Sequence, residues 1–119
     1  MSEMRYEVPK TLAAAVALLA GATRHARVLA GGTDLLAQMH AGRVEPELLI
    51  DIKDIAGMTS VVAEDGGYRV GAAVTCAELV EHEAFAKAWP GVIDGVKVIG
   101  SVQVKGRATL GGNLCNGSP

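Results

Sequence analysis

The sequence lacks the features that mark several large classes of protein. Lys and Arg number 11 against 13 Asp and Glu, and the resulting net charge of -2 gives no basic excess for a nucleic acid. The longest apolar run, Leu12–Ala20, covers less than half of the roughly 20 residues that a membrane helix needs. No basic start with a secretory cleavage site accompanies this run. We therefore expect a cytoplasmic protein without a membrane span.

Patterns for metal ions and disulfide frameworks are missing as well. Cys76 and Cys115 are far apart and belong to no CxxC pair. His25, His40 and His82 are scattered, and none has a ligand-like spacing to a Cys or to another His. We expect no metal site, and we interpret both thiols as small buried or partly buried side chains.

Aromatic residues are scarce, whereas glycine is abundant. One Trp, two Tyr and one Phe stand against 15 Gly in 119 residues. The core must therefore be built from small side chains, and the loops can approach a ligand closely. At this length, one ordinary domain can bury enough surface to fold without metal or disulfide.

The first half of the chain predicts a strand–helix–strand unit with parallel strands. Thr11 is a suitable cap for a helix at Leu12–Ala20, in which Leu12, Val16 and Leu19 share one face that we expect to be buried. The other elements predicted for this half are an extended segment at 5–9, a strand at 27–30, a glycine turn, a helix at about 34–41 and a strand at 48–52.

The second half predicts a hairpin followed by short helices. Asp65-Gly66 lies between two β-branched runs, which is a strong hairpin signal. Thr75 and Glu78 form a capping box at the start of a helix that reaches residue 81 or 82. The remaining predictions are a helix at 84–88, a helix at 91–99 with Pro90 at its start, and an uncharged, glycine-rich loop at 108–119.

Two segments place paired glycines beside a hydroxyl, and we call them the first glycine loop (residues 30–35) and the second glycine loop (residues 109–113). The first lies between a strand and a helix, where backbone N–H groups and the helix dipole favour phosphate. Thr33 could donate a further hydrogen bond. A diphosphate could then bind without a cluster of basic side chains.

For the first glycine loop taken alone, a purely structural interpretation is favoured. A strand-to-helix turn often uses Gly for its backbone freedom, and Thr or Asp as a helix cap. Asp34 would repel a diphosphate unless it turns away to cap the helix. The chain also lacks the GxGxxG and GxxxxGK[ST] patterns, so neither the Rossmann fingerprint nor the P-loop explains these glycines.

Four segments in this order resemble the flavin-binding medium chain of molybdenum-containing hydroxylases, the carbon monoxide dehydrogenase and xanthine dehydrogenase family. That family shows A-G-G-x-[DSN]-L, then L-I-D-I, then I-G-A-x-x-T, then I-G-S-x-Q-[IV]-[RK]-x-x-[GA]-T-[IL]-G-G-N. The corresponding segments of this chain are 30–35, 49–52, 70–75 and 99–113. The resemblance runs from about Tyr6 to Pro119.

The resemblance implies an α+β, two-lobed FAD-binding fold of the vanillyl-alcohol-oxidase type. A small N-terminal α/β lobe at 1–57 and the first part of an antiparallel-sheet lobe at 58–119 would hold FAD between them. By position, the cofactor-binding residues would be Ala30, Gly31, Gly32, Thr33, Asp34 and Leu35 in the first glycine loop, and Thr109, Leu110, Gly111, Gly112 and Asn113 in the second.

The family's role is electron transfer from iron–sulfur clusters, through FAD, to a terminal acceptor. The implied partners are a molybdopterin-binding large subunit and an iron–sulfur small subunit, and no residue of this chain need be catalytic. Two other hypotheses remain open from the sequence. One is a docking module of the same complex with a degenerate flavin site, and the other is an unrelated α/β nucleotide binder.

The chain departs from the family pattern at several positions. Val102 stands where Pro is common, Lys105-Gly106 replaces Arg-Asn, and Ala108 replaces Gly. Lys105 keeps the charge but not the planar fork of Arg. Family members also continue well beyond Pro119, so we expect part of a longer protein that holds FAD weakly by itself and is inactive alone.

Overall fold

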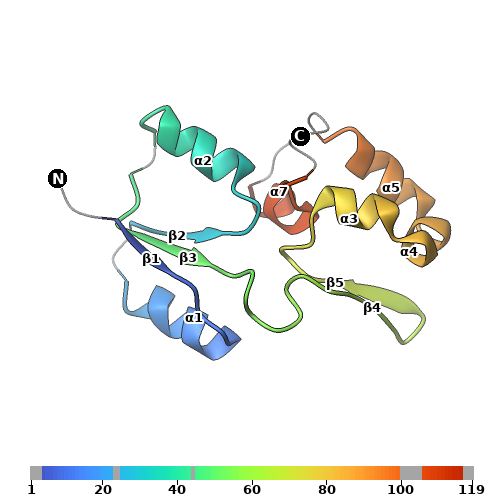
Figure 1. Cartoon of the computed structure of the whole chain (residues 1–119), viewed down its shortest axis with the longest axis horizontal. Coiled ribbons are helices and arrows are strands. Elements are labelled where there is room, and N and C mark those ends of the chain that lie inside the picture. Colours follow the sequence, from blue (N-terminus) through green and yellow to red (C-terminus); the bar gives the residue numbers. More distant parts are fainter. Residues whose placement is uncertain (1–3, 23–24, 44, 100–105, 117–119) are drawn as a thin grey trace.

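The computed structural model describes residues 4–22, 25–43, 45–99 and 106–116. It combines helices and strands in an elongated chain (Figure 1). The radius of gyration of the Cα atoms is 15.2 Å. A compact domain of this length would have a value of about 13.5 Å. None of the helices in the described ranges has the length and apolar character that crossing a membrane requires.

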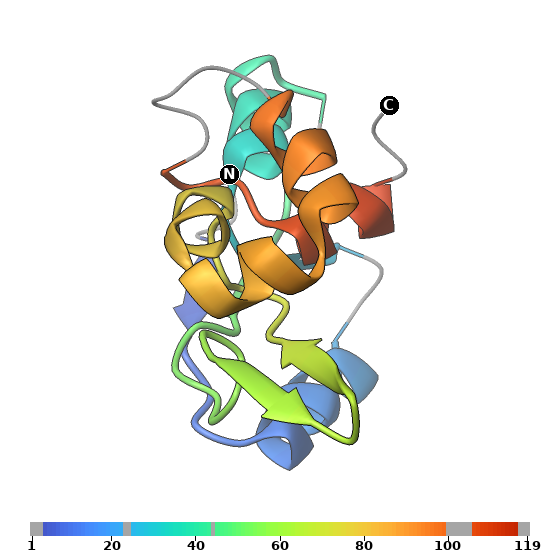
Figure 2. The same cartoon turned by 90° about the vertical axis from the view of Figure 1, so that its right-hand side faces the viewer.

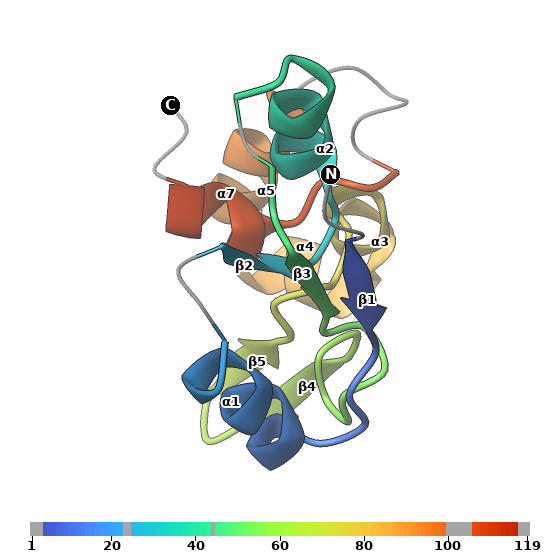
Figure 3. The ribbon, with the colours of Figure 1, turned by 90° about the vertical axis from the view of Figure 1, so that its left-hand side faces the viewer.

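The N-terminal half is a parallel sheet with one helix on each side (Figures 1 and 3). The strands β1 (Arg5–Glu7), β3 (Leu48–Asp51) and β2 (Ala26–Leu29) lie in the order β1-β3-β2. Helix α1 (Leu12–Ala20) covers one side and helix α2 (Thr33–His40) lies on the other. All four residues of the central strand β3 are buried, as a strand covered on both faces requires.

Most predictions for this half are confirmed. Strands β2 and β3 pair in parallel. Thr11 caps α1, since its Oγ1 accepts a hydrogen bond from the N–H of Ala14 at 3.1 Å. Helix α2 begins at Thr33, one residue before the predicted start, and Gly42 follows its end with a φ of +72°.

The predicted buried face of α1 is wrong. Leu12, Val16 and Leu19 are 59%, 56% and 42% exposed. Ala15 is instead buried against the sheet, and Leu18 packs beside it. The stretch is apolar on every side, so no polar residues mark which face turns to solvent. Packing against the neighbouring strands sets the orientation of α1, and it leaves Leu12, Val16 and Leu19 outside.

The C-terminal half consists of a hairpin covered by short helices (Figure 2). Strands β4 (Val61–Glu64) and β5 (Gly67–Val70) pair antiparallel. Helices α3 (Cys76–Glu81), α4 (Glu83–Ala88) and α5 (Pro90–Lys97) pack together over one face of the hairpin (Figures 1 and 2). The hairpin, the three helices and the position of Pro90 confirm the sequence predictions.

Local side-chain chemistry explains these elements. Asp65 and Gly66 both have positive φ, +44° and +78°, which is the geometry of a type I′ turn. At the start of α3, Thr75 Oγ1 accepts from the N–H of Glu78 at 3.2 Å and donates to the Glu78 carboxylate at 3.1 Å. The capping hydroxyl and the third helical residue thus stabilise the helix start together.

The two halves have separate hydrophobic clusters. The N-terminal cluster surrounds Ile50, which is fully buried. The C-terminal cluster is larger and consists of Val74, Cys76, Leu79, Phe85, Ile93, Val96 and Ala108. Cys76 is therefore buried as expected, whereas Cys115 is exposed, contrary to the interpretation of both thiols as buried or partly buried.

The prediction of a loop over 108–119 is wrong in part, because this segment contains helix α7 (Leu110–Asn116). Thr109 precedes this helix and caps it, with Oγ1 accepting from the N–H of Gly112 at 2.9 Å. The paired glycines and the lack of charged residues favoured a loop. The Thr109 cap and the contacts described below nevertheless stabilise α7. The predictions for 100–105 and 117–119 lie outside the described residues.

Candidate functional site

The first glycine loop joins β2 to α2 and depends on the conformation of Gly32. This glycine occupies the cap position of α2 with a φ of +84°, and its carbonyl accepts from the N–H of Leu36 at 2.9 Å. A Cβ built on Gly32 would lie 2.9 Å from Cδ1 of Leu29. The left-handed backbone therefore favours glycine, and an added Cβ would also have to displace the end of the Leu29 side chain.

Asp34 is not the cap that the sequence analysis expected. Gly32 holds the cap position, and Asp34 is the second residue of α2. The backbones of Thr33 and Asp34 belong to the helix, while their side chains lie outside the described part of the structure. The predicted hydroxyl contact from Thr33 therefore remains a prediction. Gly32, at the cap position, contributes no side-chain hydrogen bond to the start of α2.

The second glycine loop leads into α7 and is held at Thr109. This residue is only 4% exposed, and its carbonyl accepts from the N–H of Asn113 at 3.0 Å. Gly111 and Gly112 lie in the first turn of the helix. A Cβ on Gly112 would lie 2.8 Å from the Thr109 hydroxyl that caps it. Small residues are therefore needed for space here.

The structure brings the two glycine loops together. A Cβ on Gly31 would lie 1.9 Å from the carbonyl oxygen of Arg107 and 3.2 Å from Cα of Ala108. Arg107 and Ala108 directly precede the second loop, and α7 lies beside the β2–α2 connection (Figures 1 and 3). The two backbones therefore touch at a point where no other residue than glycine fits.

The turn at 70–75 supports the second glycine loop from the other side. Thr75 and Thr109 form an antiparallel bridge, and the N–H of Cys76 donates to the carbonyl of Ala108 at 2.8 Å. A Cβ on Gly111 would lie 3.0 Å from Cα of Ala72. Three of the four segments that carry the family resemblance are thus in direct contact.

The fourth segment, at the end of β3, reaches the first loop through Lys53. Asp51 is 4% exposed and accepts hydrogen bonds from the Tyr6 hydroxyl and, at 3.0 Å, from the N–H of Lys53. The Lys53 ammonium lies 3.0 Å from the Asp51 carboxylate and donates to the carbonyl of Ala30 at 3.0 Å. Ala30 is the first residue of the first glycine loop.

Opposing effects set the ionisation of the Asp51 carboxyl group. Burial raises the pKa of Asp51, but the hydrogen bond from Tyr6 and the contacts with Lys53 together outweigh it and hold the pKa below 3.8. The hydrogen bond to Asp51 raises the pKa of Tyr6 above 10.0. Asp51 is therefore a carboxylate at neutral pH, with Tyr6 as a neutral donor.

The sequence analysis did not identify Lys53 or Tyr6. The only available signal was the Asp-x-Lys sequence directly after an apolar strand. Such a lysine is usually solvated, and its contact with Ala30 depends on the pairing of β2 with β3.

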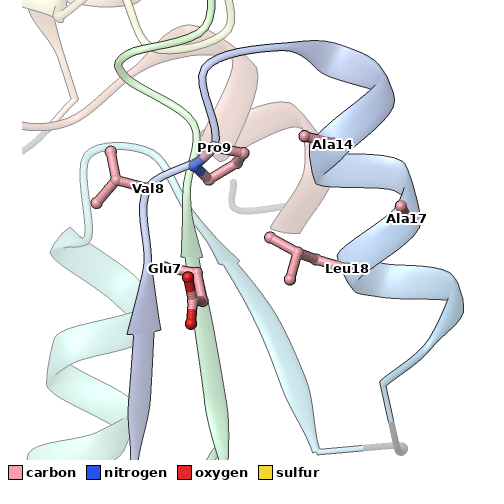
Figure 4. A pocket seen from close by; sticks show the side chains of 6 residues that line it. All are labelled: Glu7, Val8, Pro9, Ala14, Ala17 and Leu18. Carbon is pink, nitrogen blue, oxygen red and sulfur yellow. The ribbon is translucent and has the colours of Figure 1, made fainter.

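A hollow of about 470 Å³ lies elsewhere, between the end of β1 and helix α1 (Figure 4). Its lining is mostly apolar and consists of Glu7, Val8, Pro9, Ala14, Ala17 and Leu18. None of the residues predicted to bind a cofactor lines it. It also lacks converging polar groups, so it is not the candidate site. The described residues contain no group of three or more His, Cys, Asp or Glu side chains that could hold a metal ion.

Comparison with known proteins places this geometry in a family. The chain is 37% identical over 114 residues to the xanthine dehydrogenase FAD-binding subunit of Escherichia coli O157:H7, covering 95% of this chain and 39% of that protein. It is 34% identical over 114 residues to the carbon monoxide dehydrogenase medium chain of Afipia carboxidovorans, covering 96% and 40%. The chain thus spans about two fifths of these curated relatives.

Solved structures agree with the sequence relatives. A chain of the Cu,Mo-CO dehydrogenase superposes with a TM-score of 0.91 and 33% identity, covering 98% of this chain and 41% of that one. A chain of quinoline 2-oxidoreductase from Pseudomonas putida 86 superposes with a TM-score of 0.86 and 29% identity, covering 93% and 39%. The mixed helix and strand fold is therefore shared with these oxidoreductases.

Residues 2–119 match the family described as the FAD binding domain in molybdopterin dehydrogenase. This match confirms the resemblance found in the sequence and confirms FAD as the cofactor. It also removes the hypothesis of an unrelated nucleotide binder. The chain belongs to the family of FAD-binding domains of molybdopterin dehydrogenases.

Proposed function

We propose that the two glycine loops together bind FAD, with the first loop at the diphosphate and the second loop at the flavin portion. The main support for this proposal is the contact of Gly31 with Arg107 and Ala108, which brings both loops to one place. The binding residues would be Ala30, Gly31, Gly32, Thr33, Asp34 and Leu35, with Thr109, Leu110, Gly111, Gly112 and Asn113.

The residues present fit such a group. The start of α2 has a glycine in the cap position, so no side chain of the cap residue covers the first backbone N–H groups. The positive end of the helix dipole favours an anion at this place. A diphosphate can therefore be bound by peptide dipoles, consistent with the net charge of -2.

The proposed role of the subunit is electron transfer. Bound FAD would accept electrons from iron–sulfur clusters and pass them to a terminal acceptor. The chain's own residues would position the cofactor and exclude water from it, and none would act as a catalytic acid or base. Two relatives are a FAD-binding subunit and a medium chain, which supports partners of the kinds expected, a molybdopterin-binding large subunit and an iron–sulfur small subunit.

The two-lobed, vanillyl-alcohol-oxidase-type fold is part of the same proposal. Separate hydrophobic clusters support lobes at 1–57 and 58–119, one around the parallel sheet and one over the hairpin. The glycine loops would then belong to different lobes, with the cofactor lying where the lobes meet. A cytoplasmic location stays a prediction.

Visible absorption tests the function directly. Protein expressed from the complete reading frame should be yellow, or should become so after FAD is added and excess is removed. Its affinity for FAD should exceed that for the mononucleotide FMN, because the first loop would bind the diphosphate that FMN lacks. Protein that remains colourless with FAD would contradict the proposal and favour a docking module with a degenerate flavin site.

A further inference from the structure

Lys53 connects the strand ends of the N-terminal half to the first glycine loop. Its Nζ donates to the carbonyl of Ala30 at 3.0 Å and lies 3.0 Å from Oδ2 of Asp51. These contacts join the end of β3 to the residue that follows β2. The lysine thus contacts the loop at the peptide bond between Ala30 and Gly31.

Asp51 gives the lysine a fixed anchor. It is the last residue of β3 and lies opposite Leu29 in the sheet, where the N–H of Ile52 donates to the Leu29 carbonyl at 3.2 Å. Its side chain is 6% exposed, and it accepts from Tyr6 on the neighbouring strand β1. All three parallel strands therefore contribute to the position of one ammonium group.

The position of this ammonium group determines how the first loop is presented. In a trans peptide the C=O and the following N–H point in opposite directions. Holding the Ala30 carbonyl on Lys53 therefore turns the N–H of Gly31 the other way. It also keeps a carbonyl dipole, which repels anions, directed to a cation. On its other side, Gly31 is confined by the carbonyl of Arg107.

We propose that Tyr6, Asp51 and Lys53 are positioning residues that fix the Ala30–Gly31 peptide for binding the diphosphate of FAD. The inference rests on the proposed function and adds residues outside both glycine loops. Lys53 acts through the Ala30 carbonyl, while Tyr6 and Asp51 act through Lys53. Loss of the lysine should weaken cofactor binding more than it weakens the fold, because its side chain is 45% exposed.

The test compares Lys53→Met with Lys10→Met in protein expressed from the complete reading frame. Lys10 is a suitable control because it also pairs with an aspartate, Asp54, at 2.6 Å, but is 75% exposed and belongs to a pair outside both glycine loops. Titration of the apoprotein with FAD should give about tenfold weaker binding for Lys53→Met and less than twofold for Lys10→Met. Lys53→Arg, which keeps a cationic donor, should recover most of the affinity.

Hydrogen exchange of the apoprotein supplies a readout that does not require FAD. The amides of Gly31 and Gly32 should exchange faster in Lys53→Met and, to a smaller extent, in Tyr6→Phe, with no change in Lys10→Met. Unchanged exchange and unchanged FAD affinity in Lys53→Met would overturn the inference. Equal losses in Lys53→Met and Lys10→Met would do the same, because the effect would then be one of charge alone.

The two proposals fail in different ways. Wild-type protein that binds no FAD contradicts the proposed function, while the exchange measurement still decides whether Lys53 fixes the loop. If Lys53→Met does not fold, Tyr6→Phe takes its place, since it removes only the hydroxyl that donates to Asp51. Unchanged exchange and affinity in Tyr6→Phe would then overturn the inference.

Discussion

The two glycine loops meet at one place but are held by different means. The first loop starts its helix at a left-handed glycine, Gly32, which has no side chain to act as a cap. The second loop starts its helix with the buried hydroxyl of Thr109 and a bridge to Thr75. The first loop thus needs a left-handed residue at Gly32 and space at Gly31, whereas the second loop needs space and a side-chain cap. Substitutions in the two loops should therefore fail for different reasons.

The largest effect is expected for Gly31→Ala. The added Cβ would lie 1.9 Å from the Arg107 carbonyl oxygen, so the two loops must separate. We expect a loss of roughly 3 kcal/mol or more in the free energy of unfolding, together with loss of FAD binding. Urea denaturation and FAD titration measure the two effects. Gly95→Ala in α5, where a Cβ meets nothing within 4 Å, should stabilise the protein, and equal losses in both variants would contradict the assignment.

A smaller loss is expected for Gly32→Ala. Here the left-handed backbone and the contact with Leu29 act together, and we expect the free energy of unfolding to fall by about 2 kcal/mol. Gly42→Ala isolates the backbone contribution, because Gly42 has a φ of +72° but open space around it. Thermal melting of both variants gives the difference. A Gly42→Ala loss as large as that of Gly32→Ala would show that packing adds nothing in the first loop.

Asp51→Asn tests the anchor below the first loop. Removal of the buried carboxylate should lower the free energy of unfolding by roughly 1–2 kcal/mol at neutral pH. Since the folded pKa lies below 3.8, the folded state binds fewer protons, and this stability is present above pH 3.8. It is lost as the pH falls through the folded pKa. Denaturation curves of wild type and variant should therefore converge in acid, and a constant difference down to low pH would contradict the ionised Asp51.

The smallest effect separates capping from cofactor binding in the second loop. Thr109→Ala should destabilise the protein by about 1 kcal/mol through loss of the α7 cap. Thr11→Ala removes an equivalent cap from α1, which contains none of the predicted cofactor-binding residues, and should cost a similar amount. Only Thr109→Ala should weaken FAD binding in a fluorescence titration. Equal affinities in the two variants would place Thr109 outside the flavin site.

Sequence reasoning succeeded where a polar side chain marks the structure locally. The hydroxyls of Thr11 and Thr75 indicate helix starts, and Asp65-Gly66 indicates the hairpin turn. Each of these signals acts within a few residues of itself. The glycine loops were identified from local signals too, and the family resemblance added the prediction that both bind one cofactor.

Sequence reasoning failed where contacts between residues far apart in the chain determine the local structure. Leu12 and Val16 were assigned to the wrong side of α1 because no residue of that helix is polar. Helix α7 was taken for a loop because its support comes from Thr75 across a bridge. Lys53 was missed for a similar reason, since its carbonyl acceptor lies 23 residues earlier and is brought near only by the sheet.

The contact between Gly31 and Arg107 also bears on when this site is made. More than half of the printed sequence separates the two residues, so their meeting closes a very long stretch of chain. A ribosome that has released only the parallel sheet has produced only the first of the two glycine loops. Cofactor loading is therefore expected after synthesis of the second loop, as a late step in maturation.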